Sequence, residues 1–157
     1  MKLSSENTGP ETRKLVWVLS LGGFVPFGAV SVALVMLGSG HPLFDTLLDI
    51  FKIWSVIILS FLGGIRWGFA IATQPFDNRS LVLSVFGSIL AWFAILMPDT
   101  IALMTLLVLF CAHGAWDSFF INSGKAPPWF GPVRITLTFL VAIAHVLAAV
   151  ATLGGIA

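Results

Sequence analysis

Residues 59–68 read LSFLGGIRWG, and they place one arginine, Arg66, inside a run that is otherwise apolar. Small residues recur at every fourth position of this run, at Ser60, Gly64 and Gly68. In a transmembrane helix, small residues at this spacing let a neighbouring backbone approach closely. A charge at this depth costs about 2.5–3.5 kcal/mol on insertion scales. The segment therefore predicts a central membrane helix that packs on its small-residue face and needs a partner for Arg66.

The composition of the whole chain indicates an integral membrane protein. Of its 157 residues, 58% are hydrophobic and 10% are charged, whereas a soluble domain carries about 25% charged residues. A formal net charge of +1 does not favour a nucleic-acid partner. A single cysteine, Cys111, cannot form a disulfide within the chain. We therefore expect the lipid bilayer to be the main surrounding of this protein.

Five apolar segments predict an all-α, polytopic fold. They lie at about residues 15–37, 47–73, 81–97, 101–120 and 133–153, and the second begins somewhere between residues 47 and 53. Each is close to the roughly 20 residues that a helix needs to cross the hydrocarbon core. We predict a single bundle of five transmembrane helices over residues 15–157, preceded by a polar cytoplasmic tail over residues 1–14.

The link before the second span has an amphipathic pattern. Residues 42–52 read PLFDTLLDIFK, in which Asp45, Asp49 and Lys52 follow the i, i+4, i+7 spacing of one helix face. A single helix over residues 42–73 would be about 48 Å long, which exceeds a straight crossing. The pattern predicts a surface helix that bends into the span, and a tilted continuous helix is the alternative.

Basic residues fall mainly in alternate links of the chain. One side of a five-span protein would hold Lys2, Arg13, Lys14, Arg79, Lys125 and Arg134, and the other side would hold Lys52. Loops rich in Lys and Arg stay in the cytoplasm. The distribution predicts an N-terminus in the cytoplasm and a C-terminus outside.

The fourth apolar segment carries His113 and Asp117, four residues apart on one helix face. Both this segment and the second one run toward the cytoplasmic side in the predicted topology. At 1.5 Å per residue, Arg66, Asp117 and His113 would lie about 10, 6 and 12 Å from that end. We therefore predict an Arg66–Asp117 ion pair with His113 beside it, because a buried charge requires a partner.

The intramembrane cluster of Arg66, His113 and Asp117 is open to several interpretations. A structural ion pair is the simplest. A binding pocket for an anionic or quinone-like molecule or a lipid head group is the second, because arginine suits carboxylate and phosphate. A proton relay is the third. His145 is a secondary candidate near mid-membrane, and ligation of haem by His113 and His145 would need a matching depth, which they lack by about 6 Å. No catalytic or metal-binding motif is evident.

Several short motifs resemble a known family of small multi-span proteins, the transmembrane protein 69-like family. They are ILSFLGGIRWG at residues 58–68, GGFVPF at residues 22–27, and PWF at residues 128–130 leading to Arg134, Leu137 and Thr138. The resemblance covers most of residues 15–145. It implies an inner-membrane location in bacteria and a domain of unknown function, and it supplies no catalytic residues.

Two functions follow as hypotheses from these features. The first is a non-catalytic accessory or assembly subunit of a larger membrane complex, or a homo-oligomer, because the loops are short and no reactive constellation is present. The second is a small-molecule binder or transporter that uses the Arg66, His113 and Asp117 cluster. An enzyme is the least favoured, and no cofactor is predicted.

Overall fold

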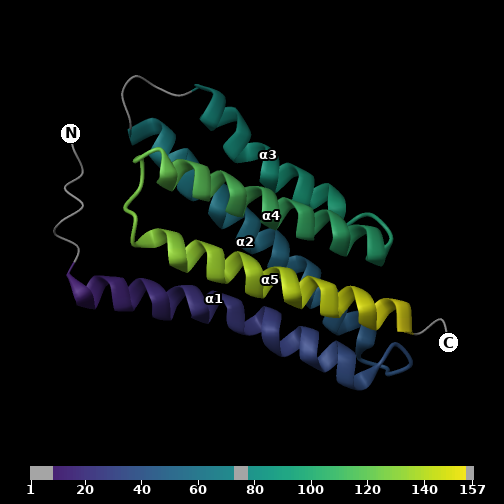
Figure 1. The fold of residues 1–157 in the computed structure, drawn as a ribbon. Helices are drawn as coiled ribbons and strands as arrows, with labels where there is room; N and C mark the ends of the chain where they lie inside the picture. Colours follow the sequence, from purple (N-terminus) through teal and green to yellow (C-terminus); the bar gives the residue numbers. More distant parts are fainter. Residues whose placement is uncertain (1–8, 73–77, 155–157) are drawn as a thin grey trace.

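The computed structural model describes residues 9–72 and 78–154, and their regular structure is helical throughout (Figure 1). The predicted all-α fold with five helices is therefore confirmed. The helices are α1 (Pro10–Leu37), α2 (Phe44–Ala72), α3 (Asn78–Ala94), α4 (Asp99–Asn122) and α5 (Phe130–Leu153). The predicted tail of residues 1–14 lies mostly outside the described residues. Its last part belongs to α1, which begins at Pro10 because proline suits the first helical turn.

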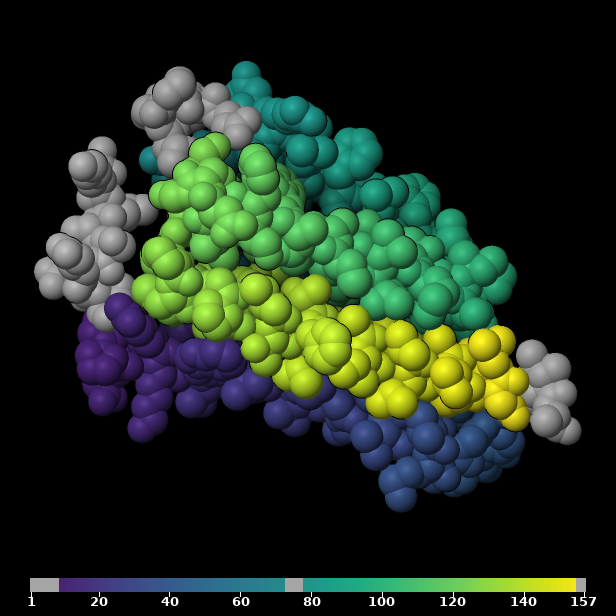
Figure 2. Space-filling view, viewed as in Figure 1, coloured from purple at the N-terminus to yellow at the C-terminus, as the bar shows by residue number. Residues whose placement is uncertain are grey.

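The helices run up and down along one bundle, so that α2 and α4 point the same way (Figure 1). The start of α1, the end of α2, the start of α3 and the α4–α5 loop share one end of the bundle. Helix α5 packs against α1 and α4 and lies between them in the space-filling view (Figure 2), and α2 packs against α1, α3 and α4. The central position predicted for the Arg66 helix is thus shared by α2 and α4.

The outer surface of the bundle is suited to lipid. Large apolar side chains are exposed along the helices, such as Leu19, Phe61, Val108 and Phe139, as is required of a helix face in hydrocarbon. Four helices, α1, α2, α4 and α5, are long and apolar enough to cross a membrane. Helix α3 is apolar but has 17 residues, which gives a length of about 25 Å. A multi-span membrane protein is confirmed, and the crossing by α3 remains a prediction.

The amphipathic segment before the second span is part of α2 and does not form a separate helix. Phe44, Leu48 and Phe51 are buried in the bundle, whereas Asp45 and Asp49 are exposed. The predicted amphipathic pattern is therefore present. The predicted surface helix is wrong, because α2 is continuous from Phe44 to Ala72 and the three apolar side chains pack its first turns against the core. The alternative of a continuous helix is correct.

The i, i+4, i+7 spacing predicts that Lys52 lies on the exposed face with Asp45 and Asp49, but it does not. Its side chain is buried, and Nζ lies 2.6 Å from Asp99 Oδ1 and 2.9 Å from Asp49 Oδ1. Asp99 is the first residue of α4. The contact therefore joins α2 to the N-terminus of α4 at the end of the bundle that holds the α1–α2 loop.

The packing face of α2 differs from the predicted small-residue face by a rotation of one residue about the helix axis. Ser60, Gly64 and Gly68 are exposed, and a Cβ atom at Gly64 or Gly68 would meet no atom within 4 Å. The buried glycine is Gly63, where a Cβ atom would overlap the carbonyl oxygen of Ser84 in α3. The close approach of α2 and α3 therefore depends on Gly63, and the predicted face points away from the bundle.

Candidate functional site

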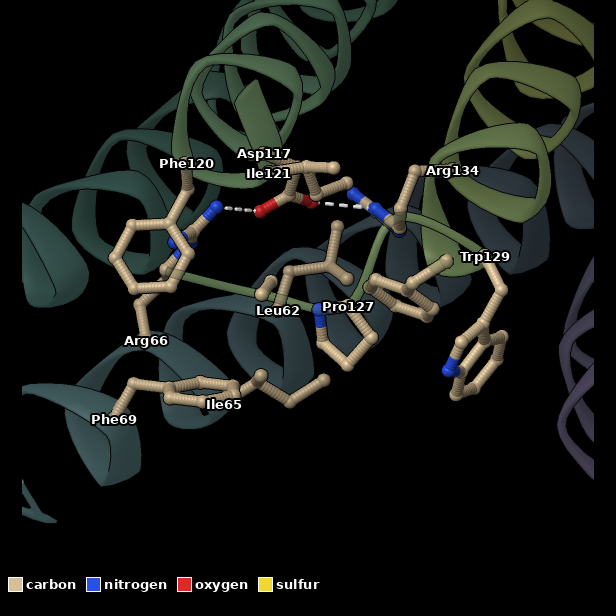
Figure 3. Close-up of a pocket in the computed structure, with 12 residues that line it drawn as sticks. Leu62, Ile65, Arg66, Phe69, Asp117, Phe120, Ile121, Pro127, Trp129 and Arg134 are labelled. Atoms are coloured by element: carbon tan, nitrogen blue, oxygen red, sulfur yellow. Dashed lines mark hydrogen bonds and ion pairs between the residues drawn. The ribbon is translucent and has the colours of Figure 1, made fainter. Parts of the chain in front are cut away.

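Three charged side chains from three helices meet near the end of the bundle that holds the α4–α5 loop (Figure 3). Arg66 of α2 donates a hydrogen bond through Nη2 to Asp117 Oδ1 of α4. Arg134 of α5 places its Nε 2.5 Å from the other carboxylate oxygen, Asp117 Oδ2. The predicted Arg66–Asp117 ion pair is present, and Asp117 is shared by two arginines.

The heights of these residues along their helices explain why they meet. Arg66 lies six residues before the end of α2, and Asp117 lies five residues before the end of α4. Arg134 lies four residues after the start of α5. Since a helix rises 1.5 Å per residue, all three lie about 6–9 Å from the same end of the bundle.

Both arginines are almost fully buried. The exposed fraction is 5% for Arg66 and 7% for Arg134. The Arg66 guanidinium carbon lies 4.3 Å from the ring centroid of Phe120 and 4.9 Å from that of Trp116. Aromatic faces attract a cation at these distances, so the rings of α4 hold the guanidinium beside Asp117.

A cavity of about 210 Å³ adjoins the cluster, and we call it the arginine cavity (Figure 3). Its charged lining consists of Arg66, Asp117 and Arg134. The rest of the lining is apolar or aromatic and comes from α2, α4, the α4–α5 loop and the start of α5: Leu62, Ile65, Phe69, Phe120, Ile121, Ala126, Pro127, Trp129 and Phe130. The cavity thus combines a few polar groups with apolar walls, as small-molecule sites do.

Two buried N–H groups at this cavity lack a hydrogen-bond acceptor among the described residues. They are Nε of Arg134 and Nε1 of Trp129. The Arg134 Nε atom is close to Asp117 Oδ2, so its contact is an ion pair without hydrogen-bond geometry. Buried donors without an acceptor are rare and costly. The Trp129 Nε1–H group is therefore a buried donor whose partner is not among the described residues.

His113 makes no hydrogen bond to Arg66 or Asp117, and its ring centroid lies 6.1 Å from that of Trp116, which contacts Arg66. Its Nδ1 donates to the carbonyl oxygen of Leu109 over 3.1 Å, and its ring packs on Gly87 of α3. It does not belong to the lining of the arginine cavity. The i, i+4 spacing places His113 and Asp117 on one side of α4, and the imidazole packs on α3 with its Nε2 buried and without a hydrogen-bond partner among the described residues.

His145 is fully buried in the centre of the bundle, far along α5 from Arg134. The rings of Phe27, Phe51 and Phe110 surround it at centroid distances of 5.6, 4.8 and 5.2 Å. Its Nδ1 donates to Val141 O over 2.8 Å, and Nε2 lies 3.2 Å from Ser55 Oγ. Both nitrogens have partners, so His145 reads as a satisfied core histidine.

Sequence reasoning did not assign Arg134 or Trp129 to the site. Arg134 was counted among the loop charges that set the orientation, and Trp129 was treated as part of a motif. A usable signal was present, because Arg134 follows Asp117 across a short link and lies at the same height in the next helix. Among the described residues, Asp117 is the acid at that height for the two arginines.

Comparison with known proteins agrees with the motifs in α2. The family model described as "Protein of unknown function (DUF3429)" matches residues 12–150. Transmembrane protein 69 of Xenopus tropicalis is 32% identical over 124 residues, which cover 76% of this chain and 47% of that protein. Transmembrane protein 69 of Mus musculus is 29% identical over 135 residues, which cover 82% of this chain and 53% of that protein.

The chain spans about half the length of these curated relatives. No solved structure matches it. The family model covers most of the sequence, including all five helices in whole or large part. The resemblance carried by residues 58–68 is confirmed, and the chain belongs to the DUF3429 family of membrane proteins of unknown function, together with proteins named transmembrane protein 69.

Proposed function

We propose that this protein binds the anionic group of a small molecule in the arginine cavity. The observation that carries the proposal is the charge balance of the site. Two buried arginines, Arg66 and Arg134, share one carboxylate, that of Asp117. The cluster therefore keeps one positive charge without a counter-ion among the described residues.

An uncompensated charge that is buried costs several kcal/mol. An anion in the cavity would remove that cost, and a carboxylate or phosphate also matches the planar donor set of arginine. The arginine N–H groups that Asp117 does not engage and the Trp129 Nε1–H group, which has no acceptor among the described residues, would supply the hydrogen bonds that such a group accepts. A neutral quinone would accept hydrogen bonds but would leave the charge unbalanced.

Additional basic residues lie beside the walls of the cavity. The Arg13 guanidinium carbon is 5.7 Å from the ring centroid of Trp129, and Lys125 Nζ is 5.7 Å from that of Phe120. Both side chains are exposed. Positive charges near an opening raise the local concentration of anions, so their placement supports an anionic ligand.

The first test compares head groups on one chain length. The full protein in a neutral maltoside detergent is titrated with decanoate, decyl phosphate and decanol, and calorimetry gives each affinity. We expect both anions to bind at least tenfold more tightly than decanol. A Trp129→Phe variant keeps the ring but loses the donor, and we expect it to bind the anions about three- to tenfold more weakly.

The control for this test removes all three charges together. Replacing a buried ion cluster by apolar residues of similar volume is often tolerated, so Arg66→Met, Asp117→Leu, Arg134→Met should fold. We expect this variant to bind decanoate and decanol alike. If the wild type shows no preference for the anions, or prefers a short-chain quinone, the proposal is wrong. A protein that co-purifies only with wild-type Arg66 would instead favour the accessory-subunit function.

We further propose that the protein lies in a bacterial inner membrane with its N-terminus in the cytoplasm. Arg13, Lys14, Arg79 and Lys125 belong to the end of the bundle where α1 begins, and this supports the orientation through the positive-inside rule. The arginine cavity would then open near the cytoplasmic side.

This orientation is tested with two exposed loop serines in a Cys111→Ala background. A membrane-impermeant maleimide applied to intact cells whose outer membrane is permeable should label Ser39→Cys, which is in the α1–α2 loop. It should label Ser123→Cys, which follows α4, only after lysis. The opposite pattern would reverse the orientation and place the cavity on the outer side.

A further inference from the structure

We infer that the ligand is a single-chain amphiphile, whose anionic head lies in the arginine cavity and whose hydrocarbon chain lies in a second, adjoining cavity between α1, α2 and α5. This inference rests on the function proposed above and narrows it to a class of molecule. The second cavity has a volume of about 150 Å³, and we call it the apolar cavity.

The two cavities adjoin through a shared wall. Four residues line both of them: Leu62, Ile65, Phe130 and Arg134. Arg134 is the charged member of this wall, so one basic residue borders both cavities. A head group held by Arg134 in the arginine cavity therefore has an apolar space directly beside it.

The apolar cavity extends along one face of α5. Its lining from that helix is Phe130, Arg134, Leu137, Thr138 and Val141, at positions i, i+4, i+7, i+8 and i+11. This face is about 16 Å long. Phe27 and Phe110 also belong to the lining, with ring centroids 5.6 Å apart. Their rings also lie 5.6 and 5.2 Å from that of His145, so this part of the lining adjoins the aromatic core of the bundle.

The chemistry of the apolar cavity suits a hydrocarbon chain. Apart from Arg134, its side chains are apolar or aromatic except for the hydroxyls of Ser20 and Thr138. No acidic residue belongs to this lining among the described residues. A site with one charged end beside an apolar cavity is complementary to a fatty-acid-like molecule. The described lining residues offer no charged partner for a second charged group on the hydrocarbon chain of a ligand.

Gly23 of α1 offers a way to fill the apolar cavity without moving the backbone. It belongs to the lining, and a Cβ atom added there would meet nothing within 4 Å. Its carbonyl oxygen accepts a hydrogen bond of 3.1 Å from Trp54 Nε1, which a new side chain leaves in place. Gly22, the preceding residue, also has open space at its Cβ position but is exposed and outside the lining.

The experiment compares butanoate with decanoate on the full chain in maltoside detergent. Each buried methylene strengthens binding about fourfold, so decanoate should bind wild-type protein far more tightly than butanoate. We expect Gly23→Leu to lower the decanoate affinity at least tenfold and to leave the butanoate affinity unchanged. Gly22→Leu is the matched control and should behave as wild type.

Two results separate this inference from the proposed function. Ser20→Leu is a second substitution that would fill the apolar cavity. If Gly23→Leu and Ser20→Leu both fold and leave the decanoate affinity unchanged, the hydrocarbon chain of the ligand does not occupy the apolar cavity, although the proposed head-group site is unaffected. If wild-type protein fails to prefer decanoate over decanol, the proposed function itself is wrong. Decyl phosphate shows whether the head is a phosphate, because a phosphate ligand would bind more tightly than decanoate and keep the same dependence on Gly23.

Discussion

Replacing Asp117 by asparagine is expected to destabilise the protein by about 3–5 kcal/mol. The substitution keeps the shape of the side chain but removes the one negative charge between Arg66 and Arg134. Breaking a buried ion pair by removing one partner costs this much because the remaining charge is buried without compensation. Here two like charges would remain side by side. Unfolding by sodium dodecyl sulfate in mixed micelles would measure the loss.

The control for Asp117→Asn is Asp45→Asn, at an exposed position of α2. Surface substitutions of this kind change stability by less than about 0.5 kcal/mol. The variant Arg66→Met, Asp117→Leu, Arg134→Met should recover most of the loss, because it removes the stranded charges as well. A cost below about 1 kcal/mol for Asp117→Asn would mean that the arginines have another counter-ion, and the charge balance behind the proposed function would be wrong.

Replacing Gly63 by alanine is expected to destabilise the protein by about 1–3 kcal/mol. The added methyl group would overlap the backbone carbonyl of Ser84 and would press on Ser88 Oγ at 3.2 Å. A backbone atom cannot rotate away, so α2 and α3 would have to separate, as in other overpacked cores. The same unfolding titration measures this effect.

The neighbouring glycine gives the matched control for this prediction. Gly64→Ala adds the same methyl group to open space, and alanine is favoured over glycine in a helix by about 0.5–1 kcal/mol. We expect Gly64→Ala to be neutral or slightly stabilising. If Gly64→Ala were the more harmful substitution, α2 would be rotated by one residue relative to the described structure, and the originally predicted packing face would be restored.

The positions of the helices and the heights of residues along them were predictable from the sequence, because they follow from the lengths of the apolar runs and the rise per residue of a helix. Apolar runs of the right length defined the five helices, and the rise per residue placed Arg66 and Asp117 at matching heights. The ion pair between them is present. The link before α2 was harder, because an amphipathic pattern is the same for a surface helix and for the first turns of a buried one.

Rotation about the helix axis was not predictable with the same accuracy. Neighbouring residues differ by about 100°, so choosing Gly64 in place of Gly63 turned the packing face toward lipid. The buried side of α2 carries Leu59, Leu62, Gly63 and Arg66 together. The contacts of His113 were not predictable for a related reason. Its height was suitable, but the direction of its imidazole depends on the close approach of Gly87 in another helix.

The ion pairs at the two ends of α2 have a mechanical consequence. Lys52 joins the first half of α2 to Asp99, the first residue of α4, and Arg66 joins its second half to Asp117. These two helices are parallel neighbours, so a slip of one past the other by one turn, about 5.4 Å, would break both ion pairs at once. The two ion pairs therefore favour one register of α2 relative to α4. Sliding of α2 past α4 would therefore cost two ion pairs, whereas tilting of the other helices or side-chain rotation would leave both in place.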